Sequence, residues 1–114
     1  MPEFMVVLRG ADPERKVSPS GEIEGLMEKY YNWVDRLKKE RRYIGGAPFR
    51  GGSKLLSGHR DWVVIADTPY AKAKEALTGY FIIAADSIPQ AVEIAKSCPA
   101  LTHGETVEVL ELNN

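Results

Sequence analysis

The sequence contains very few of the side chains that bind metals or attack substrates. It has one cysteine, Cys98, and two histidines, His59 and His103, among 114 residues. A single cysteine forms no intramolecular disulfide and cannot build a cysteine-based metal site. The chain also lacks a glycine-rich phosphate loop, a cluster with metal-ligand spacing and a nucleophile elbow. We therefore expect neither a metal nor a cofactor.

An excess of one charge and a long apolar run are missing as well. The 15 basic and 16 acidic residues give a formal net charge of −1, so the whole protein has no attraction to nucleic acid or to an anionic membrane. No stretch reaches the roughly 20 apolar residues that a membrane span needs. The apolar run near the N-terminus is too short for a signal peptide. We expect a cytoplasmic protein without nucleic-acid or membrane partners.

The composition that remains is typical of a globular protein. Hydrophobic residues make up 44% of the chain and charged residues 27%, which argues against disorder. The length is near the most common domain size, so we predict one domain over residues 1–114.

Two helices are predicted from apolar residues at three- and four-residue spacing. The first covers residues 19–40, follows a cap at Ser18, and has the apolar face Ile23, Leu26, Met27, Tyr30, Tyr31, Val34 and Leu37. Its basic C-terminal run is interpreted as a solvated helix end, not as a nucleic-acid patch. The second covers residues 88–98, opens with a Ser87–Gln90 capping box, and buries Ile88, Ala91, Val92, Ala95 and Cys98.

Apolar runs between turn residues predict the strands. They are residues 4–9, a strand starting at Tyr43 with a bulge at Gly45–Gly46, a hairpin of residues 55–56 and 62–65, and residues 80–85 and 106–112. A short helix over residues 71–77, ending at Gly79, is also expected.

This order predicts an α+β sandwich with both helices on one face of a mainly antiparallel sheet. The strands are apolar on both faces, so the face without helices also needs cover. A second copy of the chain is the simplest cover, and we expect a homodimer.

Residues 63–83 resemble the signature segment of YCII-related proteins of the DGPF type. The matching residues are Asp67, Pro69, Tyr70, Ala71, Lys74, Glu75 and Gly79, whereas Thr68, Lys72 and Ala73 depart from the pattern. The resemblance implies a ferredoxin-like subunit that pairs into a dimeric α/β barrel. It also implies that most such proteins have no assigned activity. More distant relatives use a His–Asp dyad with the histidine near the start of the first helix. Residues 18–23 of this chain contain no histidine, so that dyad is not carried over.

The signature segment also supplies the predicted site. We expect Asp67, Tyr70, Lys74 and Glu75 to line one cleft beside the first helix, because polar groups that close to a core must be satisfied by each other or by a ligand. Asp67 either fixes the turn through backbone N–H groups or acts as a base or ligand anchor. His103 is the histidine expected to approach it as a catalytic partner.

Three further residues are interpreted from their positions in the sequence. Arg50 can bind an anionic ligand bidentately or form a salt bridge at the rim. His59 is expected to be solvated in the hairpin turn. Cys98 is expected to be a small buried hydrophobic residue rather than a nucleophile, since it lies near a helix end of the wrong polarity.

Three functions fit the sequence. The first is a small-ligand-binding or accessory domain without catalysis. The second is an acid–base enzyme, of the lyase, isomerase or dehalogenase type, acting on a small acidic or aromatic metabolite. The third is a regulatory protein-interaction module. A deep pocket with a buried carboxylate of raised pKa would favour the enzyme, and an exposed apolar patch would favour the interaction module.

Overall fold

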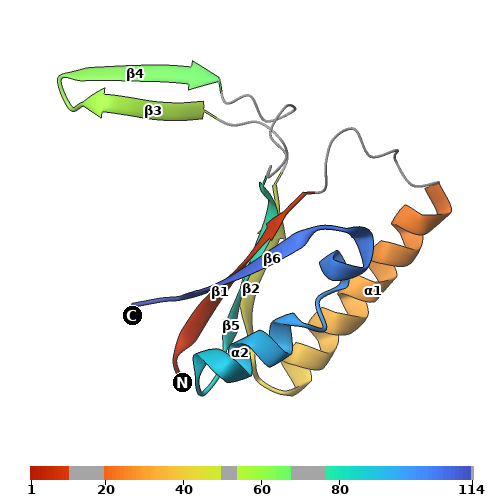
Figure 1. The fold of residues 1–114 in the computed structure, drawn as a ribbon. Helices are drawn as coiled ribbons and strands as arrows, with labels where there is room; N and C mark the ends of the chain where they lie inside the picture. The colour runs from red at the N-terminus through yellow and green to blue at the C-terminus, as the bar shows by residue number, and fades with distance from the viewer. Residues whose placement is uncertain (11–19, 50–53, 68–76, 114) are drawn as a thin grey trace.

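The fold is known from a computed structural model, which describes residues 1–10, 20–49, 54–67 and 77–113. The elements, shown in Figure 1, are β1 (Glu3–Arg9), α1 (Ser20–Lys39), β2 (Tyr43–Pro48), β3 (Lys54–His59), β4 (Trp62–Asp67), β5 (Leu77–Ala84), α2 (Ile88–Ala95), the 3-10 helix η2 (Pro99–His103) and β6 (Thr106–Glu111).

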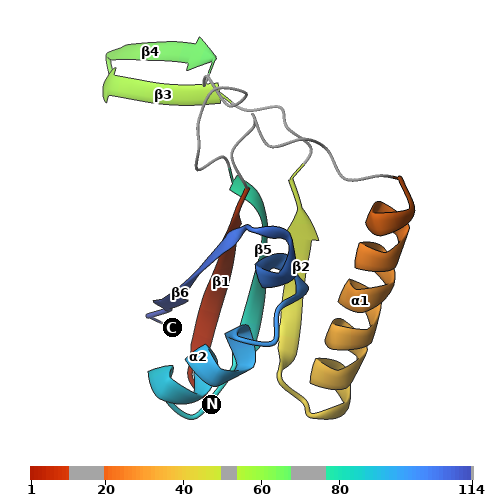
Figure 2. The ribbon, with the colours of Figure 1, turned by 45° about the vertical axis from the view of Figure 1, so that its right-hand side comes forward.

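Four of the strands form one antiparallel sheet in the order β2-β5-β1-β6. Both helices lie on the same face of this sheet, and Figure 2 shows the same layering after rotation. Within the described part of the chain, strands β3 and β4 pair with each other alone, as a separate hairpin between β2 and β5 in the sequence. Without the hairpin the order is βαββαβ with the sheet order of a ferredoxin-like fold. The predicted fold class and the extra hairpin are therefore confirmed.

The core lies between the helices and the sheet. Alternate residues of β1 point into it, and Phe4, Val6 and Leu8 are at most 5% exposed. Phe81 of β5 lies among three aromatic rings: its centroid is 6.0 Å from that of Tyr30, 5.1 Å from that of Trp33 and 6.4 Å from that of Tyr43. Burial of these side chains provides most of the driving force for packing α1 on the sheet.

The opposite face of the sheet carries apolar side chains that none of the described helices covers. The strand register places Met5 beside Ile82 and Leu110, and Val7 beside Tyr80. We call these five residues the open face. An exposed ion pair, Arg9–Glu108 at 3.1 Å, lies on the same side. The prediction of strands that are apolar on both faces is thus confirmed.

Three details of the sequence prediction were wrong. On α1, Tyr31 is 70% exposed and Met27 50% exposed, whereas Trp33 is buried. The buried stripe is narrower than predicted, because Tyr31 lies about 100° around the helix from Tyr30. On α2, Ile88 and Val92 are exposed, and the helix ends at Ala95. The predicted helix end at Leu77–Gly79 is instead the start of β5, while residues 71–76 lie outside the described part of the chain.

The start of α2 and the end of α1 follow the sequence. Ser87 Oγ accepts a hydrogen bond from the Gln90 N–H at 3.4 Å, as expected of a helix cap. At the end of α1, Lys39 pairs with Asp35 at 3.2 Å, and Arg42 donates to the Ala84 carbonyl and to Gln90 Oε1. Lys39 and Arg42 of the basic run therefore make contacts within the protein.

Candidate functional site

The structure tests the predicted site residues only in part. Arg50, Tyr70, Lys74 and Glu75 lie outside the described residues. Asp67 is the last residue of β4, so its strand belongs to the hairpin and not to the four-stranded sheet. His103 is the last residue of η2. The backbone alone is described for both, and the predicted Asp67–His103 cleft stays a prediction.

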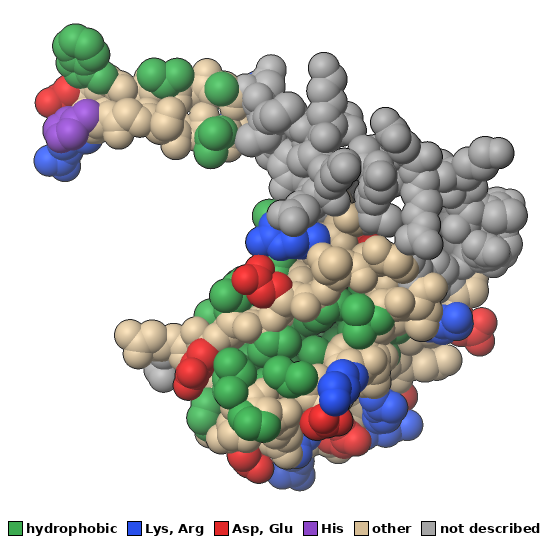
Figure 3. Space-filling view, in the orientation of Figure 1, with side chains coloured by type: hydrophobic (Ala, Val, Ile, Leu, Met, Phe, Trp, Pro, Cys, Tyr) green, Lys and Arg blue, Asp and Glu red, His purple; other side chains and the backbone are tan. Residues whose placement is uncertain are grey.

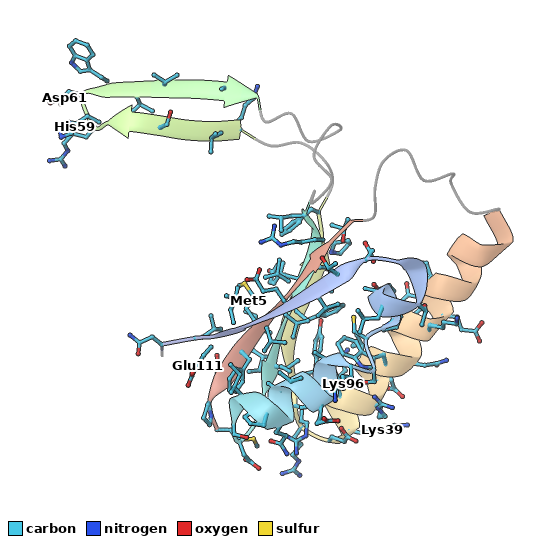
Figure 4. The ribbon with its side chains drawn as sticks, viewed as in Figure 1. Met5, Lys39, His59, Asp61, Lys96 and Glu111 are labelled. Atoms are coloured by element: carbon cyan, nitrogen blue, oxygen red, sulfur yellow. The ribbon has the colours of Figure 1, made fainter. Side chains whose placement is uncertain are left out.

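His59 and Cys98 lie as expected. His59 is exposed at the tip of the hairpin, where Figure 4 labels it beside Asp61. Cys98 is 1% exposed and belongs to the core. Its position differs from the prediction in one respect, because it lies beyond the end of α2 at Ala95 and is the N-cap residue of η2.

A group of four polar side chains meets at one end of the sheet. Thr78 lies at the start of β5, Glu105 immediately before β6, Tyr30 on α1 and Cys98 between α2 and η2. This is the end of the sheet at which β5 begins, at Leu77. We call the four residues the Glu105 cluster.

Two hydrogen bonds hold Glu105, one at its carboxylate and one at its backbone N–H. Thr78 Oγ1 donates to Glu105 Oε1 at 2.8 Å, and the Glu105 N–H donates to the Ala100 carbonyl at 3.3 Å. The turn that presents it depends on Gly104, whose φ of 76° is a conformation that side chains with a Cβ rarely adopt. Glu105 is half-buried, so its carboxylate lies at the boundary between core and solvent.

Tyr30 and Cys98 are held in their neutral forms. Burial, followed by the negative charges of Cys98 and Glu105, raises the pKa of the Tyr30 phenol well above its ordinary value. Burial raises the pKa of the Cys98 thiol from 9.0 to about 11, although the Ala100 N–H and the Tyr30 hydroxyl oppose the change. The Tyr30 and Cys98 side chains are close enough for a hydrogen bond to affect both pKa values.

These protonation states determine what the cluster can do. At neutral pH the Tyr30 phenol is protonated and can donate a hydrogen bond, and the Cys98 thiol is a neutral, mostly apolar group. Neither therefore acts as a nucleophile or base. The carboxylate of Glu105 is the one charged group of the cluster. It has a second oxygen, Oε2, that can accept a further hydrogen bond. The arrangement is suited to binding a donor group.

Hydrogen bonds of Ser97 connect α1 to the end of α2 beside this cluster. Its Oγ accepts hydrogen bonds from Trp33 Nε1 and from an Arg36 guanidinium nitrogen, each at 2.8 Å, and donates to the Ile94 carbonyl at 2.7 Å. All hydrogen-bonding positions of the hydroxyl are used. Ser97 therefore positions the helices and is not free to act on a ligand.

Sequence reasoning missed Thr78 and Glu105. One signal was present: Glu105 is a carboxylate directly after His103-Gly104 and directly before an apolar strand. What joins it to Thr78 is the pairing of β5 and β6 on the two sides of β1, which no local pattern shows.

Comparison with known proteins identifies the family. The family model described as YCII-related domain matches residues 4–113, and the chain belongs to this family. No curated protein matches it. None of the described helices is long and apolar enough to cross a bilayer.

Proposed function

We propose that this YCII-related protein is a small-ligand-binding domain and that the ligand binds at the Glu105 cluster. The observation that carries the proposal is a half-buried carboxylate, fixed by Thr78 at 2.8 Å, beside two neutral groups at the edge of an aromatic core. The ligand class that suits it is a small molecule with a hydroxyl or amino donor, because a carboxylate accepts hydrogen bonds and repels acids.

The protonation states support binding over acid–base catalysis. A general base needs a pKa near the working pH, whereas the pKa values of Tyr30 and Cys98 are raised away from it. The signature residues Asp67, Tyr70, Lys74 and Glu75, with Arg50 and His103, are proposed to complete the ligand site. We retain this assignment from the sequence, since β5 begins at Leu77, two residues after Glu75.

We also propose that the protein is a homodimer formed through the open face of the sheet. Met5, Ile82 and Leu110 give this face an apolar surface that no described helix covers. A measured mass of twice the 12.7 kDa chain would support the dimer.

Binding is tested with a panel of small alcohols, amines and carboxylic acids, measured by thermal shift and then by calorimetry. Glu105→Gln removes the charge and keeps the size and the acceptor for Thr78. The matched control is Glu93→Gln, which removes an exposed carboxylate that pairs with Lys96 at 2.8 Å on α2. We expect alcohols or amines to raise the melting temperature of the wild type and of Glu93→Gln, with at least a tenfold loss of affinity in Glu105→Gln. Equal binding by all three proteins, or no shift by any compound, would contradict the proposal.

A protein-interaction role is the second candidate, and one observation favours it. The β3–β4 hairpin exposes six large apolar side chains, which is the kind of surface that marks an interaction site.

A further inference from the structure

The β3–β4 hairpin forms an arm that stands away from the rest of the protein. Its strands contact chiefly each other, and both ribbon views show it beyond the end of the sheet (Figures 1 and 2). The radius of gyration is 16.0 Å, compared with about 13 Å for a compact chain of this length. We call residues 54–67 the arm.

The arm is too apolar to be stable in water by itself. Its six large apolar side chains are between 48% and 81% exposed: Leu55, Leu56, Trp62, Val63, Val64 and Ile65. Together they expose on the order of 600 Å² of side chain, taking Trp at the upper end of the area that an aromatic residue buries. Divided between the two faces of the arm, this area gives each face a patch of about 300 Å², comparable with the largest apolar patch of a typical monomer. An isolated two-stranded hairpin is at best marginally stable, and a third strand or a packing surface is needed.

Both faces of the arm require cover. The register pairs Leu56 with Ile65 on one face, and Val64 and Trp62 lie on the other, opposite Ser57 and His59. A single flat partner could cover only one of these faces. The surface that fits the arm must therefore provide two apolar walls.

The protein itself has a hollow with two such walls. The arm overhangs the side of the sheet away from α1, which is the side on which Figure 4 shows Met5. In the space-filling view of Figure 3, a hollow separates the arm from the body, and hydrophobic side chains lie along the arm above it. One wall of the hollow is the open face, and the other is the underside of the arm.

We propose that the arm is an exchange element of the homodimer, which inserts into the hollow of a second copy and packs between that copy's arm and open face. The inference rests on the homodimer proposed above and adds the element that joins the subunits. A two-fold axis would bury both arms and both open faces in one closed assembly. Two arms and the surfaces that they cover amount to about 2,000 Å² or more, which is the size of a stable homodimer interface.

The charges of the arm are compatible with this partner. By sequence, Lys54 and Arg60 balance Asp61 and Asp67, so two positive and two negative residues leave no net charge. The whole chain has a formal charge of only −1, so two copies meet with little repulsion. The polar tip with His59 and Arg60 can remain at the solvent-exposed rim, as is usual for interfaces.

Sedimentation equilibrium of designed variants tests the arm separately from the dimer. Trp62→Ser and Ile65→Ser each change one face of the arm, and Tyr31→Ser is the matched control, since Tyr31 is also exposed but lies on α1. We expect a dimeric wild type, at least about 30-fold weaker association of each arm variant, and an unchanged control. A dimeric wild type with unchanged arm variants would overturn the arm proposal and leave the homodimer standing. A monomeric wild type would overturn both.

Cross-linking distinguishes exchange between subunits from an arm that folds over its own sheet. Val64→Cys on the arm and Leu110→Cys on the open face are prepared as separate proteins and mixed with a short bismaleimide. Cys98 is buried and does not interfere. We expect a cross-linked pair from the mixture. A cross-link that forms only within a chain carrying both substitutions would show that the arm covers its own subunit, and would overturn the proposal.

Discussion

Two adjacent glycines of β2 provide a sharp test of the sheet, because the structure gives them opposite surroundings. A Cβ added at Gly46 would lie 2.6 Å from Phe81 Cδ1, 2.6 Å from the Tyr80 carbonyl oxygen and 3.1 Å from Phe81 Cα. Two of these atoms belong to the backbone of β5, which is held on its other side by β1. They can move only if the β2–β5 pairing or the packing of the Phe81 ring is disturbed. At Gly45 a Cβ would meet nothing within 4 Å.

The magnitudes follow from these contacts. Replacing glycine by alanine without strain stabilises a protein by about 0.4–1 kcal/mol, because the unfolded chain loses freedom. Forcing an extra methyl group into a packed site costs about 1–3 kcal/mol, or more. We therefore expect Gly46→Ala to lower the free energy of unfolding by about 1–3 kcal/mol, and Gly45→Ala to leave it unchanged or raise it slightly.

The assay is urea unfolding followed by circular dichroism, with all three proteins at one concentration, because the stability of a dimer depends on concentration. If Gly46→Ala proves as stable as Gly45→Ala, the close approach of β2 to β5 described here is wrong.

Two predictions concern the side chains between the helices. Ser97→Ala should lower the free energy of unfolding by about 1–3 kcal/mol, since it leaves the buried Trp33 N–H without its acceptor. The thermal midpoint measures this change. An unchanged midpoint would contradict the role of Ser97 in joining α1 to the end of α2. Stability should also fall at alkaline pH. The folded pKa of Cys98 lies above its ordinary value of 9.0, so its contribution is fully present below about pH 9 and is lost as pH rises toward about 11. The urea midpoint measured across this range should fall less steeply in Cys98→Ala, and identical slopes would refute this assignment.

Much of the fold could be predicted because its elements carry local signals. The Ser87–Gln90 cap, the bulge at Gly45 and the hairpin about Arg60 all appear in the structure. The failures have a common physical cause. Tyr31 has the spacing of a core residue, yet the sheet covers a narrower stripe of α1 than the periodicity allows. Thr78 and Gly79 look like the end of a helix, and only pairing with β1 and β2 makes them strand.

The candidate site was less predictable than the fold. Tyr30 and Cys98 were predicted on the apolar faces of the two helices from their spacing, and both belong to or pack against the core. The approach of Tyr30 and Cys98 to Glu105, which accepts a hydrogen bond from Thr78, depends on four segments that converge from across the sequence. Asp67 was predicted to line a cleft beside the first helix with Tyr70, Lys74 and Glu75. It is the last residue of β4, in the arm, and the cleft stays a prediction.

The order of the strands also determines when the sheet can form during synthesis. Among the described strands, β1 pairs with β5 and β6, and β2 pairs with β5, so these pairings cannot form until residues 77–84 have left the ribosome. The arm, in contrast, is a hairpin with a two-residue turn, and its two strands pair with each other. A nascent chain would therefore form the β3–β4 hairpin, with its exposed apolar side chains, before the four-stranded sheet can assemble. This order places the protein at risk of premature self-association, and growth at lower temperature or slower expression should increase its soluble yield.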